Sequence, residues 1–400
     1  MLRRPKQSPI RVVLAAPFDT KLFRSLTGLA MEHAPEGQGG APATDLAARL
    51  IQLGHDVHVV TLDPSIGEVF EYSEEGFAIT YCPLRAPPRY RTRVRSMDLF
   101  AREIAYLTHA IRAAEPDIVH AHWTYEYAEA AVRSRFPHIV TMHDLGWDYL
   151  WQFRDAYRAM RLVMKYRVMP RIRALTVVAP FMERKARHYG YFGPVAVIAN
   201  GVELPHLDAA AIERPIGDAP CIVTVGNTSR IKNVRRSLEA FRLVRETYPN
   251  AELHLFGPGL DATFAGGAPG VIGHGNVPNG ELMSFLEARA TLLVHPSLLE
   301  CCPMAIAEAK ARAVPAIGGL RSGGVPFVCG EDAGCLLTDV TDPRAIAAAA
   351  LQVLSNPTEY RQRRIRARQD IAARLAGPKI AQSYVAEYHA VLGQTQPALT

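Results

Sequence analysis

Two glutamates bracket an otherwise apolar run, ECCPMAIAE, at residues 300–308. A pair of carboxylates can perform acid–base chemistry, as in glycoside hydrolases, or accept hydrogen bonds from hydroxyl groups. Pro303 lies between them and suits the first position of a helix. On a continuous helix of about 100° per residue the two side chains would be roughly 80° apart, so they would not form one stripe. We therefore expect Glu300 and Glu308 to reach separate parts of one extended ligand. The alternative is that Glu300 only stabilises a helix start and Glu308 only faces solvent.

A turn suited to phosphate follows an apolar run at 225–233, VGNTSRIKN. Gly226 permits a tight turn, and the cations Arg230 and Lys232 follow closely. Small residues and cations at the carboxyl end of a strand suit a phosphate or pyrophosphate. The spacing differs from the phosphate loop of nucleoside triphosphatases, which argues against that class. A solvated turn with surface cations is the alternative.

A second Gly-rich loop, PEGQGGAPATDLAARL at 35–50, leads into a helical pattern. Gly39 and Gly40 leave backbone N–H groups free near a helix N-terminus, which is a weak sign of an anion site. FGPGLDA at 256–262 is weaker still, because it lacks the third glycine and the helix of a dinucleotide fingerprint.

These stretches are positioned by short apolar runs that alternate with helical patterns. Nearly continuous apolar strands separated by helices indicate parallel sheets covered on both faces. The sequence therefore predicts an α/β protein with two tandem Rossmann-like domains, an interdomain cleft and a C-terminal helical tail. The expected strands are 10–17, 55–62, 117–123, 138–144, 174–180 and 195–201, then 221–227, 252–257, 270–275, 291–297, 314–319 and 334–339.

The domain division follows from length and from a linker. Four hundred residues exceed one ordinary core, and residues 202–218 are polar and contain proline. We expect domains at 1–205 and 206–376, with a helix at about 377–394 packing back on the first. The net charge of +6 belongs to the first half, where residues 1–200 hold 26 Lys and Arg against 20 Asp and Glu. The two halves therefore have different partners.

Composition narrows the class further. A chain with 48% hydrophobic and 21% charged residues is globular, and no run approaches the roughly 18 apolar residues of a membrane span. The apolar part of the N-terminus is brief, so we read a first buried strand rather than a signal peptide. Six cysteines without regular spacing indicate reduced thiols in the cytoplasm. The adjacent Cys301 and Cys302 offer half a zinc site at most, and packing is the simpler reading.

The order of these stretches resembles the retaining glycosyltransferases of the GT-B fold, specifically family 4. The stretches that carry the resemblance are the early Gly-Gly loop and then DIVHAHW, TMHD, NGVE, VGNTSRIKN, HPSLLECCPMAIAEA, GGVP and GEDAGCLL. It covers nearly the whole chain and is strongest over 221–340. It implies a nucleotide-sugar co-substrate, with UDP- and GDP-sugars as first candidates, a hydroxyl acceptor and no cofactor.

The resemblance also implies roles for individual residues. Glu308 matches a glutamate that holds the donor ribose, and Glu300 matches one near the donor sugar. Lys232 and Gly40 match residues at the diphosphate, and His143 matches a histidine beside the reacting centre. The full set is catalytic His143, Glu300 and Lys232; diphosphate-binding Gly39, Gly40, Arg230, Lys232, Cys302 and Met304; nucleotide-binding Gly226, Asn227, Gly257, Val277 and Glu308; acceptor-side His120, His122 and Asp144; and no metal ligand.

Three departures separate this chain from the family pattern. Asn227 stands where the family usually has arginine, and Arg230 is the nearest substitute. ECCPMA replaces EGFGLP, and Pro303 removes one backbone donor, which leaves the sugar preference open. Residues 18–38 resemble an insertion near the acceptor side.

The expected mechanism needs no metal. Glycosyl transfer requires stabilisation of a departing diphosphate, and the chain contains no D-x-D motif. Lys232, Arg230, the glycine-loop amides and the helix start near Pro303 would supply preorganised charge instead. We expect retention through a front-face, oxocarbenium-like route. The alternatives are a nucleotide-sugar epimerase or phosphorylase, or a non-catalytic binding protein; a hydrolase is less compatible with the phosphate-suited turns.

The acceptor is indicated only by charge. The segments 85–112 and 153–173 are rich in basic residues, and the second carries apolar residues between them. One reading is that these basic segments rest on an anionic membrane surface, at the inner face of the membrane. The other is that they form solvated helix faces. Nucleic acid is disfavoured because the aromatic residues form no stacking series. His120 and His122, near a strand end, are as often structural as functional.

Overall fold

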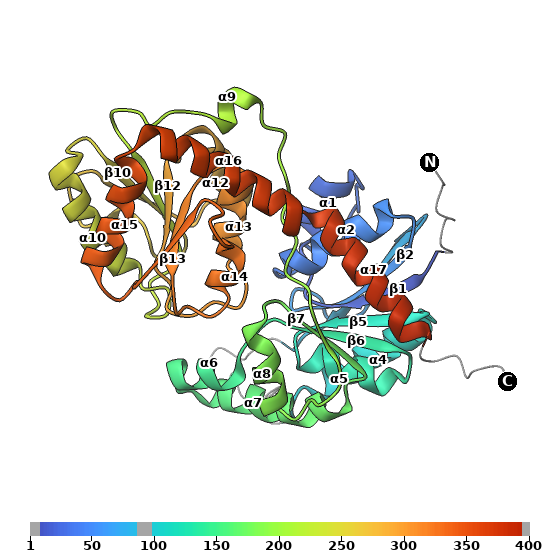
Figure 1. The fold of residues 1–400 in the computed structure, drawn as a ribbon. Helices are drawn as coiled ribbons and strands as arrows, with labels where there is room; N and C mark the ends of the chain where they lie inside the picture. The colour runs from blue at the N-terminus through green and yellow to red at the C-terminus, as the bar shows by residue number, and fades with distance from the viewer. Residues whose placement is uncertain (1–8, 86–97, 394–400) are drawn as a thin grey trace. The chain divides into compact units, whose positions relative to one another are not determined.

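The computed structural model describes residues 9–85 and 98–393, so part of the basic segment 85–112 lies outside the described residues. Its contacts divide the chain into two compact units. Unit 1 comprises Met1–Gly201 together with Gly377–Thr400, and unit 2 comprises Val202–Ala376 (Figure 1). Both units are α/β, as the alternation of apolar runs and helical patterns predicts.

Unit 1 is built around an eight-stranded sheet of order β3-β4-β2-β1-β5-β6-β7-β8. Neighbouring strands are parallel except β3 and β4, which pair antiparallel. The strands are β1 (Arg11–Ala15), β2 (Asp56–Asp63), β3 (Phe70–Glu74), β4 (Phe77–Pro83), β5 (Ile118–His122), β6 (His138–Met142), β7 (Ala174–Val177) and β8 (Val195–Val197).

Helices cover this sheet, which is why its central strands are buried along their whole length. Every residue of β5 and β6 is buried. The helices are α1 (Thr20–Thr27), α2 (Ala41–Gln52), α4 (Ala101–Ala113), α5 (Glu126–Ser134), α6 (Gly146–Phe153), α7 (Ala156–Val168), the 3₁₀ turn η1 (Met169–Arg171), α8 (Phe181–His188) and α17 (Gly377–Gly393). The last of these returns from the end of the chain and packs on α2 and β6.

Unit 2 holds a six-stranded parallel sheet of order β11-β10-β9-β12-β13-β14. The strands are β9 (Cys221–Val225), β10 (Glu252–Phe256), β11 (Val271–Gly275), β12 (Leu292–His295), β13 (Ala316–Gly319) and β14 (Cys335–Thr338). The strand order reverses at β9, so the carboxyl ends of β9, β10 and β12 surround the position where such sheets bind ligands.

The helices of unit 2 pack an aliphatic core on this sheet. Phe241 and Val244 of α10 are buried with Ile346 and Val353 of α15. The helices are α9 (Ala209–Ile212), α10 (Val234–Thr247), α11 (Ala262–Ala265), α12 (Asn279–Ala288), α13 (Met304–Ala311), α14 (Val325–Cys329), α15 (Pro343–Leu354) and α16 (Pro357–Arg374).

The cysteines correct one expectation. Cys329 and Cys335 are joined by a disulfide, although the spacing of the six cysteines indicates only reduced thiols. Cys329 ends α14 and Cys335 begins β14, and the short loop between them brings their Cα atoms to 5.3 Å. Cys82 and Cys221 are buried thiols, and burial raises their pKa values to about 12 and about 11. The cysteines therefore no longer argue for a reducing compartment.

One further prediction concerns membranes. None of the helices within 9–85 and 98–393 combines the length and the apolar character needed to cross a bilayer.

Candidate active site

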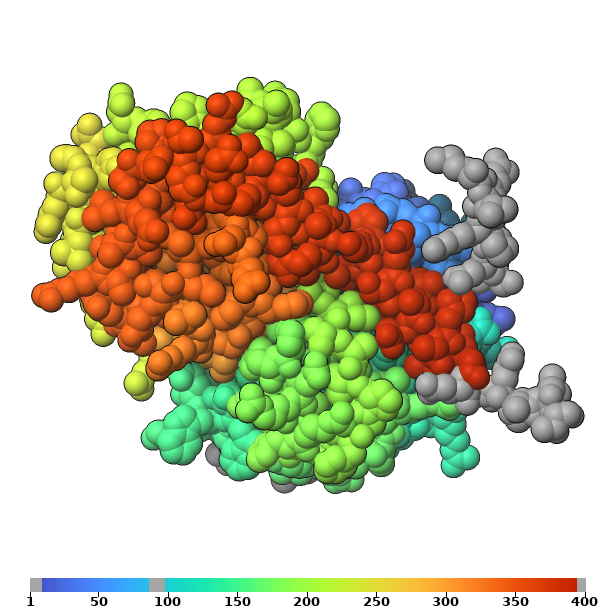
Figure 2. Space-filling model, in the orientation of Figure 1, coloured from blue at the N-terminus to red at the C-terminus, as the bar shows by residue number. Residues whose placement is uncertain are grey.

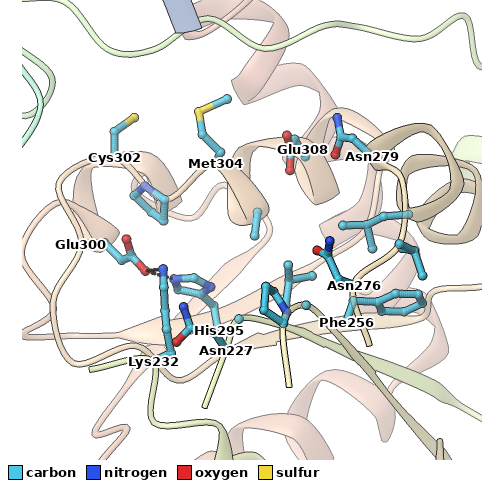
Figure 3. Close-up of a pocket in the computed structure, with 18 residues that line it drawn as sticks. Asn227, Lys232, Phe256, Asn276, Asn279, His295, Glu300, Cys302, Met304 and Glu308 are labelled. Carbon is cyan, nitrogen blue, oxygen red and sulfur yellow. Dashed lines mark hydrogen bonds and ion pairs between the residues drawn. The ribbon is translucent and has the colours of Figure 1, made fainter. Parts of the chain in front are cut away.

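A cavity of about 460 Å³ lies in unit 2 at the carboxyl ends of β9, β10 and β12 (Figure 3). Figure 3 shows Lys232, Glu300 and His295 at one end and Phe256, Asn276, Asn279 and Glu308 at the other. The cavity is lined by Val225, Gly226, Asn227, Lys232, Phe256, Gly257, Pro258, Asn276, Val277, Asn279, Leu282, His295, Glu300, Cys302, Pro303, Met304, Ala305 and Glu308.

The loops after β9 and β12 are joined, which is why Lys232 and Glu300 meet. The Leu298 amide donates to the Ile231 carbonyl at 2.8 Å. The Asn233 side-chain amide donates to two carbonyls, those of Pro296 and Val340, at 3.2 and 2.8 Å. The asparagine thus holds both loops and begins α10.

Lys232, Glu300 and His295 form one charged cluster. Lys232 Nζ donates to Glu300 Oε1 at 2.6 Å, and His295 Nε2 lies 3.1 Å from the same oxygen. The backbone of Glu300 is fixed as well, because its carbonyl accepts from the Gly324 amide at 2.7 Å. Gly323 and Gly324, of the GGVP stretch, therefore position the first glutamate.

The cluster keeps Glu300 ionised. Burial alone would raise the pKa of this carboxyl, but the hydrogen bond and charge of His295, with Lys232, outweigh it and lower the pKa to about 2. Glu300 is therefore a carboxylate throughout the neutral range and cannot serve as a proton donor there. The Lys232 ammonium, which is paired with Glu300, also lines the cavity.

Glu308 is the second carboxylate of the cavity and stands in a different environment. It lies in α13, which begins at Met304, while Glu300 precedes the helix. Burial raises the pKa of Glu308, and the nearby Arg312 opposes this only in part. No side-chain hydrogen bond to its carboxylate occurs among the described residues of the chain. The two glutamates thus differ in their surroundings: neighbouring groups stabilise the charge of Glu300, whereas burial disfavours the charge of Glu308.

Between these carboxylates the backbone comes close to itself at Gly257. This residue has φ of 126°, and a Cβ there would collide with the Gly226 carbonyl oxygen. The Gly226 amide donates to the Phe256 carbonyl at 2.9 Å, which closes the turn after β9. Gly226 and Gly257 therefore form the floor of the cavity without side chains.

The structure brings together nine of the residues predicted for unit 2 and leaves one out. Arg230 is exposed and does not line the cavity. It lies in a tight turn, in which the Lys232 amide donates to the Ser229 carbonyl at 3.1 Å. The nine are Gly226, Asn227, Lys232, Gly257, Val277, Glu300, Cys302, Met304 and Glu308.

Asn227, in the place of that arginine, caps its own turn. Its side-chain oxygen accepts from the Ser229 amide at 2.9 Å. The residue lines the cavity but contributes no charge to it. Lys232 is therefore the only Lys or Arg that lines this cavity among the described residues.

Sequence reasoning missed His295, Asn276, Asn279 and Phe256. His295 ends β12 and Phe256 ends β10, so their positions at strand ends were a usable signal. Asn276 lies in the loop after β11 and Asn279 begins α12, where the sequence carries no motif. Both line the cavity at the same end as Phe256 (Figure 3).

In unit 1, the glycine loop caps a helix. Gly40 precedes α2 with φ of 85°, and a Cβ there would collide with the Pro17 carbonyl oxygen. Gly39 also has positive φ, of 67°. The loop thus approaches the chain just after β1 closely. The predicted insertion, 18–38, contains α1, capped by Asp19.

Three histidines lie at the carboxyl ends of β5 and β6. His122 Nδ1 is 2.8 Å from His143 Nε2, and the two rings stack at 5.0 Å between centroids. His120 Nδ1 contacts the Tyr388 hydroxyl at 2.7 Å, and its Nε2 contacts the Thr141 hydroxyl at 2.7 Å. Tyr388 belongs to α17, so the C-terminal helix completes this buried network.

Burial keeps these histidines neutral. It lowers the pKa of His143 to about 4 and that of His120 to about 3. The pKa of His122 lies well below its ordinary value, because of burial and then of its two histidine neighbours. His143 is therefore a neutral hydrogen-bonding group at physiological pH, not an acid catalyst.

His120 requires a correction. The sequence places it on the acceptor side, but the residue is fully buried and both ring nitrogens are bonded inside unit 1. Its place on a central strand and the packing of α17 over it exclude direct contact with an acceptor. His122 is also buried, and its Nε2 has no hydrogen-bond partner within the described residues. Of the predicted acceptor-side residues, Asp144 is the more exposed.

Asp144 is held by two neighbours. Lys165 Nζ of α7 donates to its carboxylate at 2.5 Å and to its carbonyl at 2.9 Å. The Tyr125 hydroxyl donates to the other carboxylate oxygen at 2.6 Å. The loop carrying His143 and Asp144 is therefore fixed to α7. Within 9–85 and 98–393, no group of three or more His, Cys, Asp and Glu side chains has a geometry that could hold a metal ion.

The chain was compared with protein families and solved structures. Residues 43–205 match the model described as Glycosyltransferase Family 4, and residues 209–370 match Glycosyl transferases group 1. None of the curated proteins matches the sequence.

Several solved structures share the fold over nearly the whole chain. A sucrose-phosphate synthase from Thermosynechococcus elongatus is 18% identical with a TM-score of 0.73, covering 96% of this chain and 100% of that one. Anabaena HepE in complex with UDP-glucose is 14% identical with a TM-score of 0.66, covering 95% and 100%. An α,α-trehalose 6-phosphate synthase from Burkholderia multivorans is 13% identical with a TM-score of 0.70, covering 97% and 98%.

The two family models cover consecutive parts of the chain that correspond to the two sheets, and the fold matches extend across both. The chain belongs to the family 4 glycosyltransferases, retaining enzymes of glycosyl transferases group 1 with the GT-B fold.

Proposed function

We propose that this enzyme moves a sugar from a nucleoside-diphosphate sugar to a hydroxyl acceptor, with retention and without a metal ion. The observation that carries the proposal is the Lys232–Glu300 ion pair, set in one cavity with Glu308. A nucleotide sugar has a charged diphosphate between two hydroxyl-bearing rings. The cavity offers a cation paired with one carboxylate at one end and a second carboxylate at the other, which suits these groups.

Lys232 stabilises the departing diphosphate in this proposal. Its ammonium is preorganised by Glu300, so the charge stands in place before the sugar–phosphate bond breaks. Transfer proceeds on one face of the sugar through an oxocarbenium-like state. The backbone N–H groups at Gly39 and Gly40 and at the start of α13, with Cys302 and Met304, are the proposed further contacts of the diphosphate.

Glu308 binds the ribose hydroxyls. Its carboxylate has room and no competing side-chain donor within the described part of the chain, so two vicinal hydroxyls can donate to its two oxygens. Gly226, Asn227, Gly257 and Val277 would surround the rest of the nucleoside. UDP is the first nucleotide to test, because HepE, which shares the fold, binds UDP and UDP-glucose; GDP is the second.

His143 contacts the donor sugar as a neutral imidazole. One ring nitrogen is engaged by His122, which leaves the other for a sugar hydroxyl. Asp144 faces the acceptor, held by Lys165. The hexose character of the sugar belongs to the same proposal. So does the nature of the acceptor, which is a polysaccharide, a lipid-linked glycan or a small-molecule glycan.

The test is a thermal-shift screen against UDP, GDP, ADP and their sugars, followed by product analysis with the donor that stabilises best. Lys232→Ala should lower transfer at least 100-fold, since removing one preorganised charge contact typically costs about 2.7–4 kcal/mol. Arg230→Ala is the matched control and should transfer normally, because Arg230 lies outside the cavity.

Three results would count against the proposal. They are full activity in Lys232→Ala, activity abolished by EDTA, and a protein that no nucleotide stabilises. Release of free nucleoside diphosphate only when an acceptor is present separates transfer from epimerisation and from simple binding. A phosphorylase would instead release sugar phosphate when given inorganic phosphate.

A further inference from the structure

The largest concentration of exposed aromatic side chains in the described residues lies in the α6–α7 segment, residues 146–168. Trp151 is 74% exposed, Trp147 46%, and Phe153 and Tyr157 each 40%. Val163 and Tyr166 of α7 are exposed as well. Exposed apolar side chains that gather on one element usually mark an interaction surface. Figure 2 shows the teal and green atoms of this part of unit 1 at the surface.

The same segment carries an excess of positive charge. Residues 146–168 contain five Lys and Arg but only Asp148 and Asp155 as acids. Both acids are engaged, Asp148 by Lys185 and Asp155 by Arg158. Among the described residues, no carboxylate pairs with Arg154 or Arg167. The surface therefore presents aromatic rings and unneutralised cations together.

The opposite side of α7 is fixed to unit 1. Leu162, Met164 and Val168 are buried, and Arg161 is bonded to Glu126 of α5. Lys165, also buried, holds Asp144. The exposed face of α7 is thus one side of a helix whose other side positions the loop that carries His143 and Asp144.

We infer that the α6–α7 segment is the surface on which this enzyme contacts an anionic lipid bilayer. Tryptophan and tyrosine favour the water–lipid interface, and Arg side chains favour anionic headgroups. The exposed aliphatic Val163 suits acyl chains. An amphipathic helix of this kind lies in the plane of the interface.

The geometry disfavours nucleic acid as the partner. Bases stack on open ring faces, but Arg154 lies 4.9 Å from the centroid of Trp151 and Arg158 lies 4.4 Å from that of Phe153. Those rings already have a cation over one face. The same arrangement suits a bilayer, where the cation remains at headgroup level beside the inserted ring.

The segment begins two residues after Asp144, so the bilayer surface and the proposed acceptor side are adjacent in unit 1. An acceptor hydroxyl carried on a lipid would therefore be presented at Asp144. That this bilayer carries the acceptor rests on the proposed function, whereas bilayer binding itself does not.

The test is co-sedimentation of the full chain with phosphatidylcholine vesicles, with and without phosphatidylglycerol, at low and high salt. We expect binding only to the anionic vesicles, weakened by salt. Trp151→Ser with Phe153→Ser should lower the partition coefficient roughly tenfold or more. Phe192→Ser is the matched control, because Phe192 is 81% exposed on another part of unit 1, and it should bind normally.

Charge is tested separately by Arg154→Gln with Arg167→Gln, which should weaken binding roughly fivefold per charge and reduce its salt dependence. All variants should keep the thermal shift with nucleotide, since that cavity lies in unit 2. Three outcomes would each overturn the inference. The parent protein binds neutral vesicles as well as anionic ones, the Trp151→Ser Phe153→Ser variant binds vesicles normally, or that variant loses self-association and vesicle binding is unchanged. Failure of the Lys232→Ala test would leave the vesicle result unaffected, so the two proposals fail separately.

Discussion

At the scale of single residues, Glu308 is the carboxylate whose charge a donor would sense most directly. The proposed ribose contact needs the ionised carboxylate, and burial raises the pKa of this group. Protonation therefore begins at a higher pH than for an ordinary glutamate, and nucleotide affinity should fall as the pH drops toward that raised pKa. Glu308→Gln should weaken binding roughly 10- to 100-fold, as expected for a hydrogen bond to a charged group of about 1.5–3 kcal/mol.

Titration calorimetry with UDP across the acidic range would measure both effects. The Glu308→Gln variant should lose the part of the pH dependence that Glu308 contributes, because an amide does not titrate there. Glu281→Gln is the control, since Glu281 is an exposed carboxylate of α12 outside the cavity. Equal pH dependence in Glu308→Gln and in the parent protein would contradict the ribose assignment.

At the scale of elements, α17 determines the environment of the histidines in unit 1. Tyr388→Phe removes the hydroxyl bonded to His120 Nδ1 and leaves that nitrogen unpaired in the core. The free energy of unfolding of unit 1 should fall by about 1–3 kcal/mol, the usual cost of an orphaned buried polar group. Urea titration that follows the unit 1 transition would measure it.

Tyr72→Phe is the control for that experiment. The Tyr72 hydroxyl bonds to Glu74 on the exposed strand β3, so its loss should change stability by no more than about 0.5 kcal/mol. If both variants had the same stability, α17 would contribute only apolar packing to the network.

The elements also show what could be predicted from sequence. Apolar runs such as those of β5 and β6 are buried on both faces, so their pattern specifies the parallel sheets. Lys232 and Glu300 were predictable because each follows a strand at the same sheet edge. His295 was missed as a partner of Glu300, since the conformation of the loop between them depends on bonds to Asn233 and to the Ile231 carbonyl, which no motif marks. The disulfide and the burial of His120 depend on tertiary packing, which spacing does not encode.

At the scale of the whole molecule, the buried histidines make stability depend on pH. His120 and His143 have folded-state pKa values of about 3 and about 4, below the ordinary value near 6.5. Below pH 6.5 the unfolded chain binds protons that the folded chain does not, so stability should fall as the pH drops from about 6.5 to about 3. It should be unaffected by these groups above pH 7.

Denaturation midpoints measured between pH 8 and pH 4 would show the slope. His120→Gln should be less stable than the parent at pH 8, because it disturbs two hydrogen bonds, but its slope should be shallower by one titrating group. A slope that does not change in the variant would mean that other groups carry the acid sensitivity.

The division of the chain has a consequence for its biosynthesis. Unit 2 is inserted between two parts of unit 1, and its ends are already paired, with the Val202 amide bonded to the Leu375 carbonyl at 2.9 Å. A ribosome therefore synthesises the whole of unit 2 before it makes α17. During that interval His120 lacks its partner Tyr388. All residues of the unit 2 cavity are thus synthesised before the helix that completes the histidine network of unit 1.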